Sequence, residues 1–252
     1  MSKLLFVMGL VLASVCHAQS WPTKPVRVIV NVAAGGVADV TARMIGARLG
    51  ETLGQGFLVE NRAGGDGYIG FDAVSRSDAD GHTLLYSPGS SMMIAPHIVN
   101  RPDLDPLKVL APVAATGRVS LYVIAHPEQP YKNFEEFLRY ARANPGKLRG
   151  VAIADRQRLS ILPDVPTMAE AGYSIEGLGW NGIFVPAGTP RAIVDRLHQD
   201  IARVLQHKEI QDDAASLGTT AGGDKPEEFA AFVRGEVQKW GKVIRDANIK
   251  AQ

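Results

Sequence analysis

Apolar runs of strand length alternate with amphipathic stretches of helical length between residues 26 and 86. The stretch 38–53 repeats apolar residues at helical spacing, directly after two glycines. This alternation favours a parallel sheet with helices on its faces, and so an α/β fold. The expected strands are 26–30, 57–60 and 83–86, and the expected helices are 38–53 and the segment from Gly67 to about Ser75.

The later part of the chain carries weaker signals of the same kind. An amphipathic helix around Phe134 to Ala141 ends at an Asn-Pro-Gly turn. Thr189-Pro190 is typical of a helix start, and Pro226 opens a final helix with one apolar face. The remaining expected elements are strands 121–125, 151–154 and 182–185, and a short helix from Pro166 to Gly172.

The N-terminus has the three-part pattern of a secretory signal peptide. Lys3 is followed by an apolar run over 4–15, and small residues at Cys16 and Ala18 precede the expected cut. Cleavage after Ala18 makes Gln19 the first residue, removes the only cysteine and sends the protein to the periplasm. A buried helix and a lipoprotein anchored at Cys16 are the alternatives, but residues 13–15 match a lipobox poorly, and the run is too short for a permanent anchor.

Composition and spacing exclude several classes of function. Lys and Arg total 27 against 26 for Asp and Glu, which gives no reason to expect nucleic acid as a partner. The histidines have no metal-ligand spacing, and no serine stands in a nucleophile elbow. We therefore expect no metal, no cofactor and no enzyme activity.

Two groups of residues suit the binding of a small anion. Gly35-Gly36 lies between a strand and a helix, where free N–H groups meet an anion, although a tight turn explains the pair equally well. Asp39 is expected to cap this helix through its first N–H groups. Ser87, Ser90 and Ser91 follow the third strand, at the edge where ligands of α/β sheets bind, and helix capping or solvent exposure is the alternative for them.

A second glycine-rich segment, Gly65 to Gly70, matches G-x-G-x-x-G. A dinucleotide site requires an acidic residue at the end of the next strand, and that strand ends in Tyr86-Ser87-Pro88. We therefore interpret the segment as a loop lining a small-ligand cleft, or as a plain turn.

Several sequence motifs follow one another in a characteristic order along the chain. They are 21–30, Gly35-Gly36 with Asp39 and Ala42-Arg43, 59–70, 80–85, 145–148, Leu162-Pro163-Asp164-Val165-Pro166 through Gly172, 186–190 and 227–244. Together they resemble the Bug family, the periplasmic receptors of tripartite tricarboxylate transporters, over nearly the whole mature chain.

The resemblance implies a type II periplasmic-binding-protein fold, in which two α/β lobes with mostly parallel sheets close on a small carboxylate. It implies a membrane permease as partner, and we expect a monomer. The expected division is a signal peptide at 1–18, lobe 1 at 19–119 plus 224–252, and a shortened lobe 2 at 120–223. By position, the loops of Ala33, Ala34, Gly35 and Gly36 and of Ser87, Ser90 and Ser91 hold the ligand.

Two departures from the family pattern bear on the ligand. Asn31, Val32, Ala33 and Ala34 replace a proline- and aromatic-rich phrase before the double glycine. After Leu148 the chain passes almost directly to the Leu-Pro-Asp-Val-Pro phrase, so roughly 70 residues of a small lobe are missing. The competing interpretations are a bilobal enzyme, a damaged receptor that no longer binds, and a receptor that signals to a membrane sensor.

Overall fold

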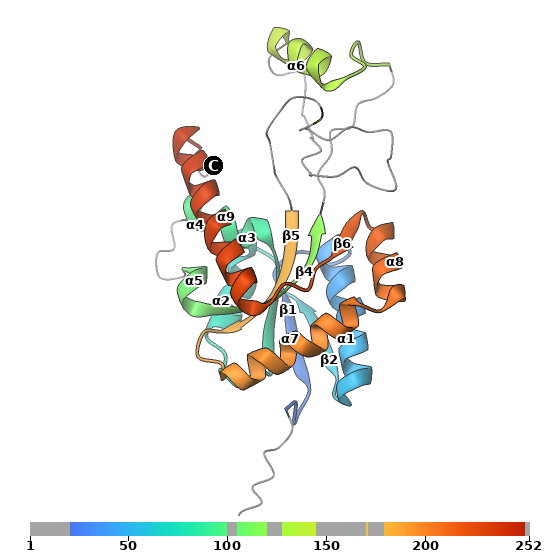
Figure 1. Cartoon of the computed structure of the whole chain (residues 1–252). Coiled ribbons are helices and arrows are strands. Elements are labelled where there is room, and N and C mark those ends of the chain that lie inside the picture. The colour runs from blue at the N-terminus through green and yellow to red at the C-terminus, as the bar shows by residue number, and fades with distance from the viewer. Residues whose placement is uncertain (1–20, 100–104, 120–127, 145–169, 171–178, 250–252) are drawn as a thin grey trace, which may run out of the picture.

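A six-stranded sheet forms the centre of the molecule. The computed structural model describes residues 21–99, 105–119, 128–144, 170 and 179–249. The strand order is β2-β1-β3-β5-β4-β6 (Figure 1). The strands are β1 (Val26–Val30), β2 (Phe57–Asn61), β3 (Thr83–Pro88), β4 (Leu110–Val119), β5 (Gly179–Pro186) and β6 (Thr219–Ala221).

The sheet is mixed in direction. Strand β1 pairs in parallel with β2 and β3, as expected from the βαβαβ pattern. Strand β5 runs antiparallel to β3 and β4, and β6 runs antiparallel to β4. The α/β fold predicted from the sequence is confirmed, and its sheet is mixed: β1 to β4 point the same way, and β5 enters between β3 and β4 from the opposite end.

Helices cover both faces of this sheet (Figure 1). One face carries α1 (Val37–Leu53), α7 (Arg191–Leu205) and α8 (Lys208–Ser216), and the other carries α2 (Tyr68–Ser75), α3 (Gly89–Met93) and α9 (Pro226–Asp246). The remaining helices are η1 (Gly65–Gly67), α4 (Ala95–Ile98), α5 (Pro106–Val109) and α6 (Phe134–Ala143).

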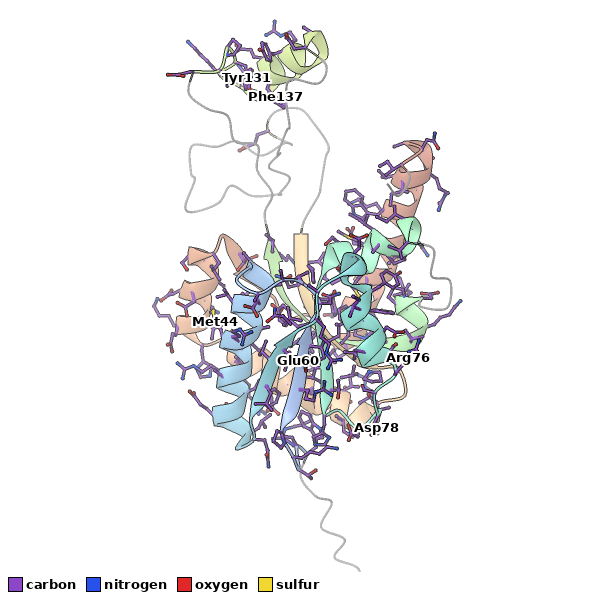
Figure 2. The ribbon with its side chains drawn as sticks, turned by 180° about the vertical axis from the view of Figure 1, so that it is seen from behind. Met44, Glu60, Arg76, Asp78, Tyr131 and Phe137 are labelled. Atoms are coloured by element: carbon purple, nitrogen blue, oxygen red, sulfur yellow. The ribbon has the colours of Figure 1, made fainter. Side chains whose placement is uncertain are left out.

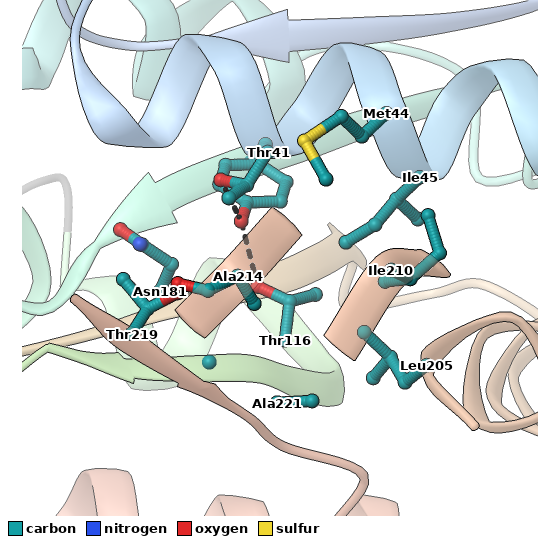
Figure 3. Close-up of a pocket in the computed structure, with 12 residues that line it drawn as sticks. Thr41, Met44, Ile45, Thr116, Asn181, Leu205, Ile210, Ala214, Thr219 and Ala221 are labelled. Carbon is teal, nitrogen blue, oxygen red and sulfur yellow. Dashed lines mark hydrogen bonds between the residues drawn. The ribbon is translucent and has the colours of Figure 1, made fainter. Parts of the chain in front are cut away.

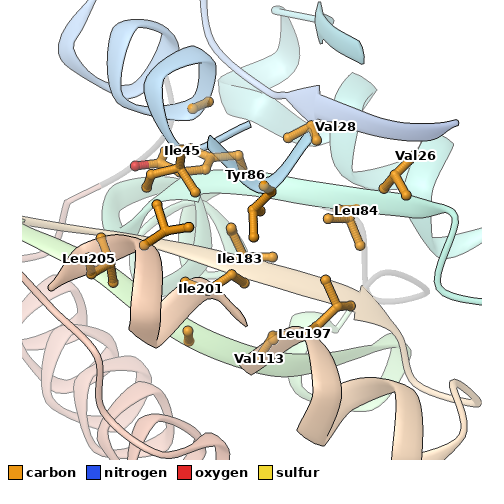
Figure 4. Packing of buried hydrophobic residues seen from close by; sticks show 14 of the residues in the cluster. Val26, Val28, Ile45, Leu84, Tyr86, Val113, Ile183, Leu197, Ile201 and Leu205 are labelled. Carbon is orange, nitrogen blue, oxygen red and sulfur yellow. The ribbon is translucent and has the colours of Figure 1, made fainter. Parts of the chain in front are cut away.

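Alternation along the strands builds two cores. Val28 and Tyr86 pack under α1 and α7, whereas Ile29 and Leu85 pack under α2, α3 and α9. Successive strand residues point to opposite faces, so each strand contributes to both cores. Figure 4 shows the first core, where Ile45 of α1 and Leu197 and Ile201 of α7 close over the strands.

The sheet includes elements that the sequence assigned to the second lobe. Strand β5 bonds to β3 and β4, and β6 bonds to β4. Helix α7 buries Leu197 and Ile201 against the same sheet. The assignment of 179–223 to lobe 2 is thus corrected, because those segments complete the first-lobe sheet by hydrogen bonding and burial.

Helix α6 lies apart from the sheet (Figure 1). Tyr131 packs on Phe137 and Tyr140, with ring centroids 5.3 and 5.4 Å apart. Figure 2 shows Tyr131 and Phe137 at its upper end. The expected strands 121–125 and 151–154 and the Pro166 helix lie outside the described residues. No helix in the described ranges has both the length and the apolar character to span a bilayer.

Candidate functional site

The loops selected from the sequence converge at one edge of the sheet. Strands β1, β2, β3 and β4 point the same way, so their carboxyl ends share this edge. The antiparallel β5 begins there. The β1–α1, β2–α2 and β3–α3 loops thus stand side by side above the sheet, the usual position of a ligand in open α/β folds.

The first loop, Ala33 to Gly36, is exposed along its whole length. Gly35 has φ +86°, a left-handed conformation that favours glycine. Gly36 caps α1 in an extended conformation without a side-chain cap. The N–H groups of the first turn therefore have no intrahelical partner and face the edge of the sheet.

Asp39 holds this loop from inside the first turn of α1. Its Oδ2 accepts a hydrogen bond from the Gly35 N–H at 2.9 Å, and its Oδ1 accepts one from Arg43 Nε at 3.0 Å. Burial opposes ionisation of the carboxyl, but these bonds outweigh burial and lower the pKa of Asp39. Asp39 therefore does not cap the first N–H groups of α1, as the sequence predicted. It accepts instead from the N–H of Gly35, ahead of the helix, and that N–H is not available to a ligand.

The glycine-rich β2–α2 loop, which contains Gly67, contacts the β1–α1 and β3–α3 loops. Asn31 Nδ2 donates to the Gly67 carbonyl at 3.3 Å. A Cβ at Gly67 would lie 2.6 Å from both Asn31 Nδ2 and Ser91 Oγ, and φ there is +93°. Glycine at 67 therefore lets the β1, β2 and β3 loops meet, which explains part of the G-x-G-x-x-G pattern without a nucleotide.

The three serines differ in accessibility. Ser87 is fully buried and its Oγ donates to the Pro88 carbonyl at 3.1 Å, so it cannot touch a ligand in this conformation. Ser90 is exposed and Ser91 is half-buried, both in the first turn of α3. Two of the three predicted hydroxyls therefore lie where a ligand can reach them.

Two residues at this edge were not selected from the sequence as binding groups. Trp180, at the start of β5, is buried with its indole against Gly89, and its Nε1 has no hydrogen-bond partner among the described residues. Arg118, near the end of β4, pairs across the sheet with Trp180. Neither carries a local sequence signal, because their meeting depends on the pairing of β4 with β5.

A small pocket lies on the face of the sheet that α1 covers, between α1, α8 and β4 (Figure 3). At its rim, Thr116 Oγ1 donates to Tyr86 Oη at 2.8 Å, and Tyr86 Oη lies 2.7 Å from Thr41 Oγ1. Burial raises the pKa of Tyr86 to about 12, despite the bonds from Thr116 and Thr41. The phenol is neutral at ordinary pH, and these hydroxyls stabilise the fold.

The edge offers hydrogen-bond donors rather than catalytic groups. No group of three His, Cys, Asp or Glu side chains suited to a metal occurs in the part of the chain that the structure describes. The accessible donors of the predicted binding loops include backbone N–H groups and the hydroxyls of Ser90 and Ser91, and the side chain of Arg118 is half-exposed at the same edge. Donors of this kind suit an anionic group.

Comparison with known sequences identifies the family of this chain. The sequence profile of the tripartite tricarboxylate transporter family receptor matches residues 41–151 and 146–249. Protein BugT of Bordetella pertussis is 28% identical over 99% of this chain and 99% of its own length. That alignment spans 324 positions against 252 residues here, so this chain is the shorter one. The two profile matches meet at 146–151, where the sequence leaves the family pattern.

Solved structures share the fold. The periplasmic binding protein BugD is 25% identical with a TM-score of 0.80, covering 92% of this chain and 100% of its own. An R. palustris protein solved with adipate has the same fold, with a TM-score of 0.83 at 24% identity and the same coverage. The profile accounts for well over half of the residues, and the chain therefore belongs to the family of tripartite tricarboxylate transporter receptors.

Proposed function

We propose that this protein is an exported receptor that binds a small carboxylate in the periplasm and delivers it to membrane permease subunits. The observation that carries the proposal is the family match over residues 41–249. The edge of the sheet supports it, because the first turn of α1 and the hydroxyls of Ser90 and Ser91 offer neutral donors to one carboxylate group. Relatives in this family are solute-binding proteins, not enzymes.

Calorimetry with citrate, malate and adipate tests the binding step. Adipate belongs in the panel because the R. palustris protein of the same fold was solved with it. Each charge-assisted hydrogen bond contributes about 1.5–3 kcal/mol. If both hydroxyls contact the ligand, replacing Ser90 and Ser91 together by alanine should weaken binding by about a hundred-fold to ten-thousand-fold. Ser216→Ala is the control, since its exposed hydroxyl bonds only to the carbonyl of Asp213 in α8.

The shortened chain favours a second candidate, a remnant that is exported but binds poorly. The difference between 252 residues and an alignment of 324 supports a missing stretch of the second lobe. If the missing stretch carried two charge-assisted hydrogen bonds to the ligand, their loss weakens binding by about a hundred- to ten-thousand-fold. A saturable, micromolar shift in melting temperature with one acid would reject the remnant, whereas millimolar binding throughout the panel would favour it.

Export is part of the proposal and has its own test. Residues 1–18 carry the signal-peptide pattern, and cleavage after Ala18 leaves Gln19 first. The intact mass of protein recovered from the periplasm should match residues 19–252. Full-length protein confined to the cytoplasm would reject export while leaving carboxylate binding untouched.

A further inference from the structure

A half-exposed arginine stands at the edge where the predicted binding loops converge. Arg118 is the second-last residue of β4, and its side chain is 47% exposed. Arg118 was not predicted from the sequence as a binding residue, because the pattern of 110–119 does not indicate a strand. Its charge distinguishes it from the neutral donors of the other loops.

The strand register places Arg118 close to the β3–α3 loop. Arg118 pairs with Trp180, and Gly117 pairs with Asn181, which in turn pairs with Pro88. Two strand spacings, roughly 10 Å, therefore separate the backbone of Arg118 from the end of β3. A long guanidinium side chain can cover much of that distance.

The side chain of Arg118 also lies on the correct face. Directly opposed residues of neighbouring strands project to the same face of a sheet, so Arg118 and Trp180 are neighbours. The Trp180 indole contacts Gly89, the residue before Ser90, and packs on Phe232 with centroids 5.8 Å apart. The Arg118 guanidinium lies over the same Phe232 ring, 5.9 Å from its centroid. A continuous row of contacts thus runs from the serine loop to the guanidinium.

The present partner of Arg118 is held loosely. Asp224 Oδ2 lies 3.6 Å from the guanidinium, and its side chain is 37% exposed. Such an exposed pair is worth at most about 1 kcal/mol. Arg43 and Arg62, which belong to the neighbouring loops, make closer contacts of 3.0 Å to Asp39 and 2.7 Å to Glu60. Arg118 can exchange its partner more readily than either of them.

We propose that Arg118 is a ligand-binding residue that pairs with a carboxylate group of the solute, and that Asp224 is the competing carboxylate it leaves. This inference rests on the proposed function, since it assumes that the solute is an acid bound at this edge. The alternative is a purely structural bridge between β4 and the segment before α9.

Substitutions at the two partners should act in opposite directions on binding. In calorimetry of the full mature chain with citrate, malate and adipate, Arg118→Gln should weaken the best acid by about ten- to a hundred-fold. Asp224→Asn should tighten it by up to about five-fold, because the competing charge is gone. Arg118→Lys keeps the charge but lacks the paired N–H donors of the guanidinium. Its affinity should therefore lie between those of Arg118→Gln and the wild type. Binding by Arg118→Gln should also depend less on salt.

A matched pair elsewhere on the surface is the control. Arg76, at the C-terminal end of α2 (labelled in Figure 2), forms an ion pair of 2.9 Å with Asp72, and its side chain is exposed. Arg76→Gln and Asp72→Asn should leave affinity within about two-fold of wild type, as expected for an exposed pair without ligand contact. Circular dichroism and melting temperature check that each variant folds.

The outcomes separate this inference from the proposed function. Unchanged affinity in Arg118→Gln, with wild-type binding intact, overturns the role of Arg118 and leaves the receptor. Equal weakening by Arg118→Gln and Asp224→Asn, with equal loss of melting temperature, assigns the pair to structure and also overturns the proposal. Absence of binding by the wild type to every acid of the panel rejects the proposed function itself.

Discussion

The indole of Trp180 lies directly against the Cα atom of Gly89. A Cβ at position 89 would sit 2.5 Å from both Nε1 and Cε2 of the ring. The ring is further enclosed by Phe184 and Phe229, at centroid distances of 6.3 and 5.4 Å. Position 89 therefore has to be glycine for β5 to pack beside the start of α3.

Gly89→Ala should destabilise the protein by about 1–3 kcal/mol, the usual cost of forcing a methyl group into a filled core. Because the clash displaces the turn that carries Ser90, we also expect weaker carboxylate binding. Denaturant unfolding followed by tryptophan fluorescence measures the loss. A variant as stable as the wild type would mean that Trp180 moves aside at little cost.

Gly235→Ala is the opposite case within the same protein. Gly235 lies inside α9, is exposed, and a Cβ there meets no atom within 4 Å. Alanine should raise the unfolding free energy by about 0.5–1 kcal/mol through helix propensity alone. A loss of stability would contradict the open surroundings of position 235.

Only part of this fold could be predicted from the sequence. Helices α1 and α9 and strands β1 to β3 were predictable, because their apolar positions repeat at the period of the element. Strand β4 was not, since Pro112 and Gly117 interrupt it and its register shifts beside both. Local patterns also do not state which strands pair, so the place of β5 was missed.

The same reasoning explains what was found of the site. Gly35-Gly36 and the serines were selected because loops after parallel strands share an edge, and Ser90 and Ser91 are accessible there. Ser87 was selected with them but is buried, because β3 continues through Pro88. Trp180 and Arg118 required the β4–β5 register, which only the folded chain supplies.

The buried Tyr86 hydroxyl predicts loss of stability at alkaline pH. Its pKa is raised from 10.0 to about 12 by burial. Because the folded pKa lies above the unfolded one, the folded state favours the neutral phenol. Its contribution is fully present below pH 10 and is lost as pH rises from 10 through 12, by about 2–3 kcal/mol in all.

Tyr86→Phe isolates this contribution. At neutral pH the variant should be about 1–2 kcal/mol less stable, because Thr41 and Thr116 lose their shared partner in the core. Between pH 10 and 12 its stability should fall less than that of the wild type. Urea unfolding at several pH values gives both numbers, and parallel curves for the two proteins would contradict the assignment to Tyr86.

Asp39 predicts the behaviour of the first loop. Its carboxylate accepts from the Gly35 N–H and pairs with Arg43, and it is only 4% exposed. Asp39→Ala leaves the Gly35 N–H without this acceptor and removes a charge-assisted contact, so it should cost about 1–3 kcal/mol. Asp39→Asn can still accept from Gly35 and should lose less. Asp212→Ala, which breaks only an exposed pair with Lys208, should cost under about 0.5 kcal/mol.

The pH dependence of the Asp39 variants completes the test. The pKa of Asp39 is lowered from 3.8 in the folded state, so its stabilising contribution is present above that value and is lost as pH falls through the folded pKa. The stability difference between wild type and Asp39→Ala should therefore shrink once the pH drops below about 4. Amide exchange at Gly35 should be faster in Asp39→Ala than in Asp39→Asn, since only the alanine removes the acceptor of that N–H. Equal exchange in the two variants would mean that the loop is held without Asp39, and the left-handed turn at Gly35 would then owe its position to the packing of α1 on the sheet.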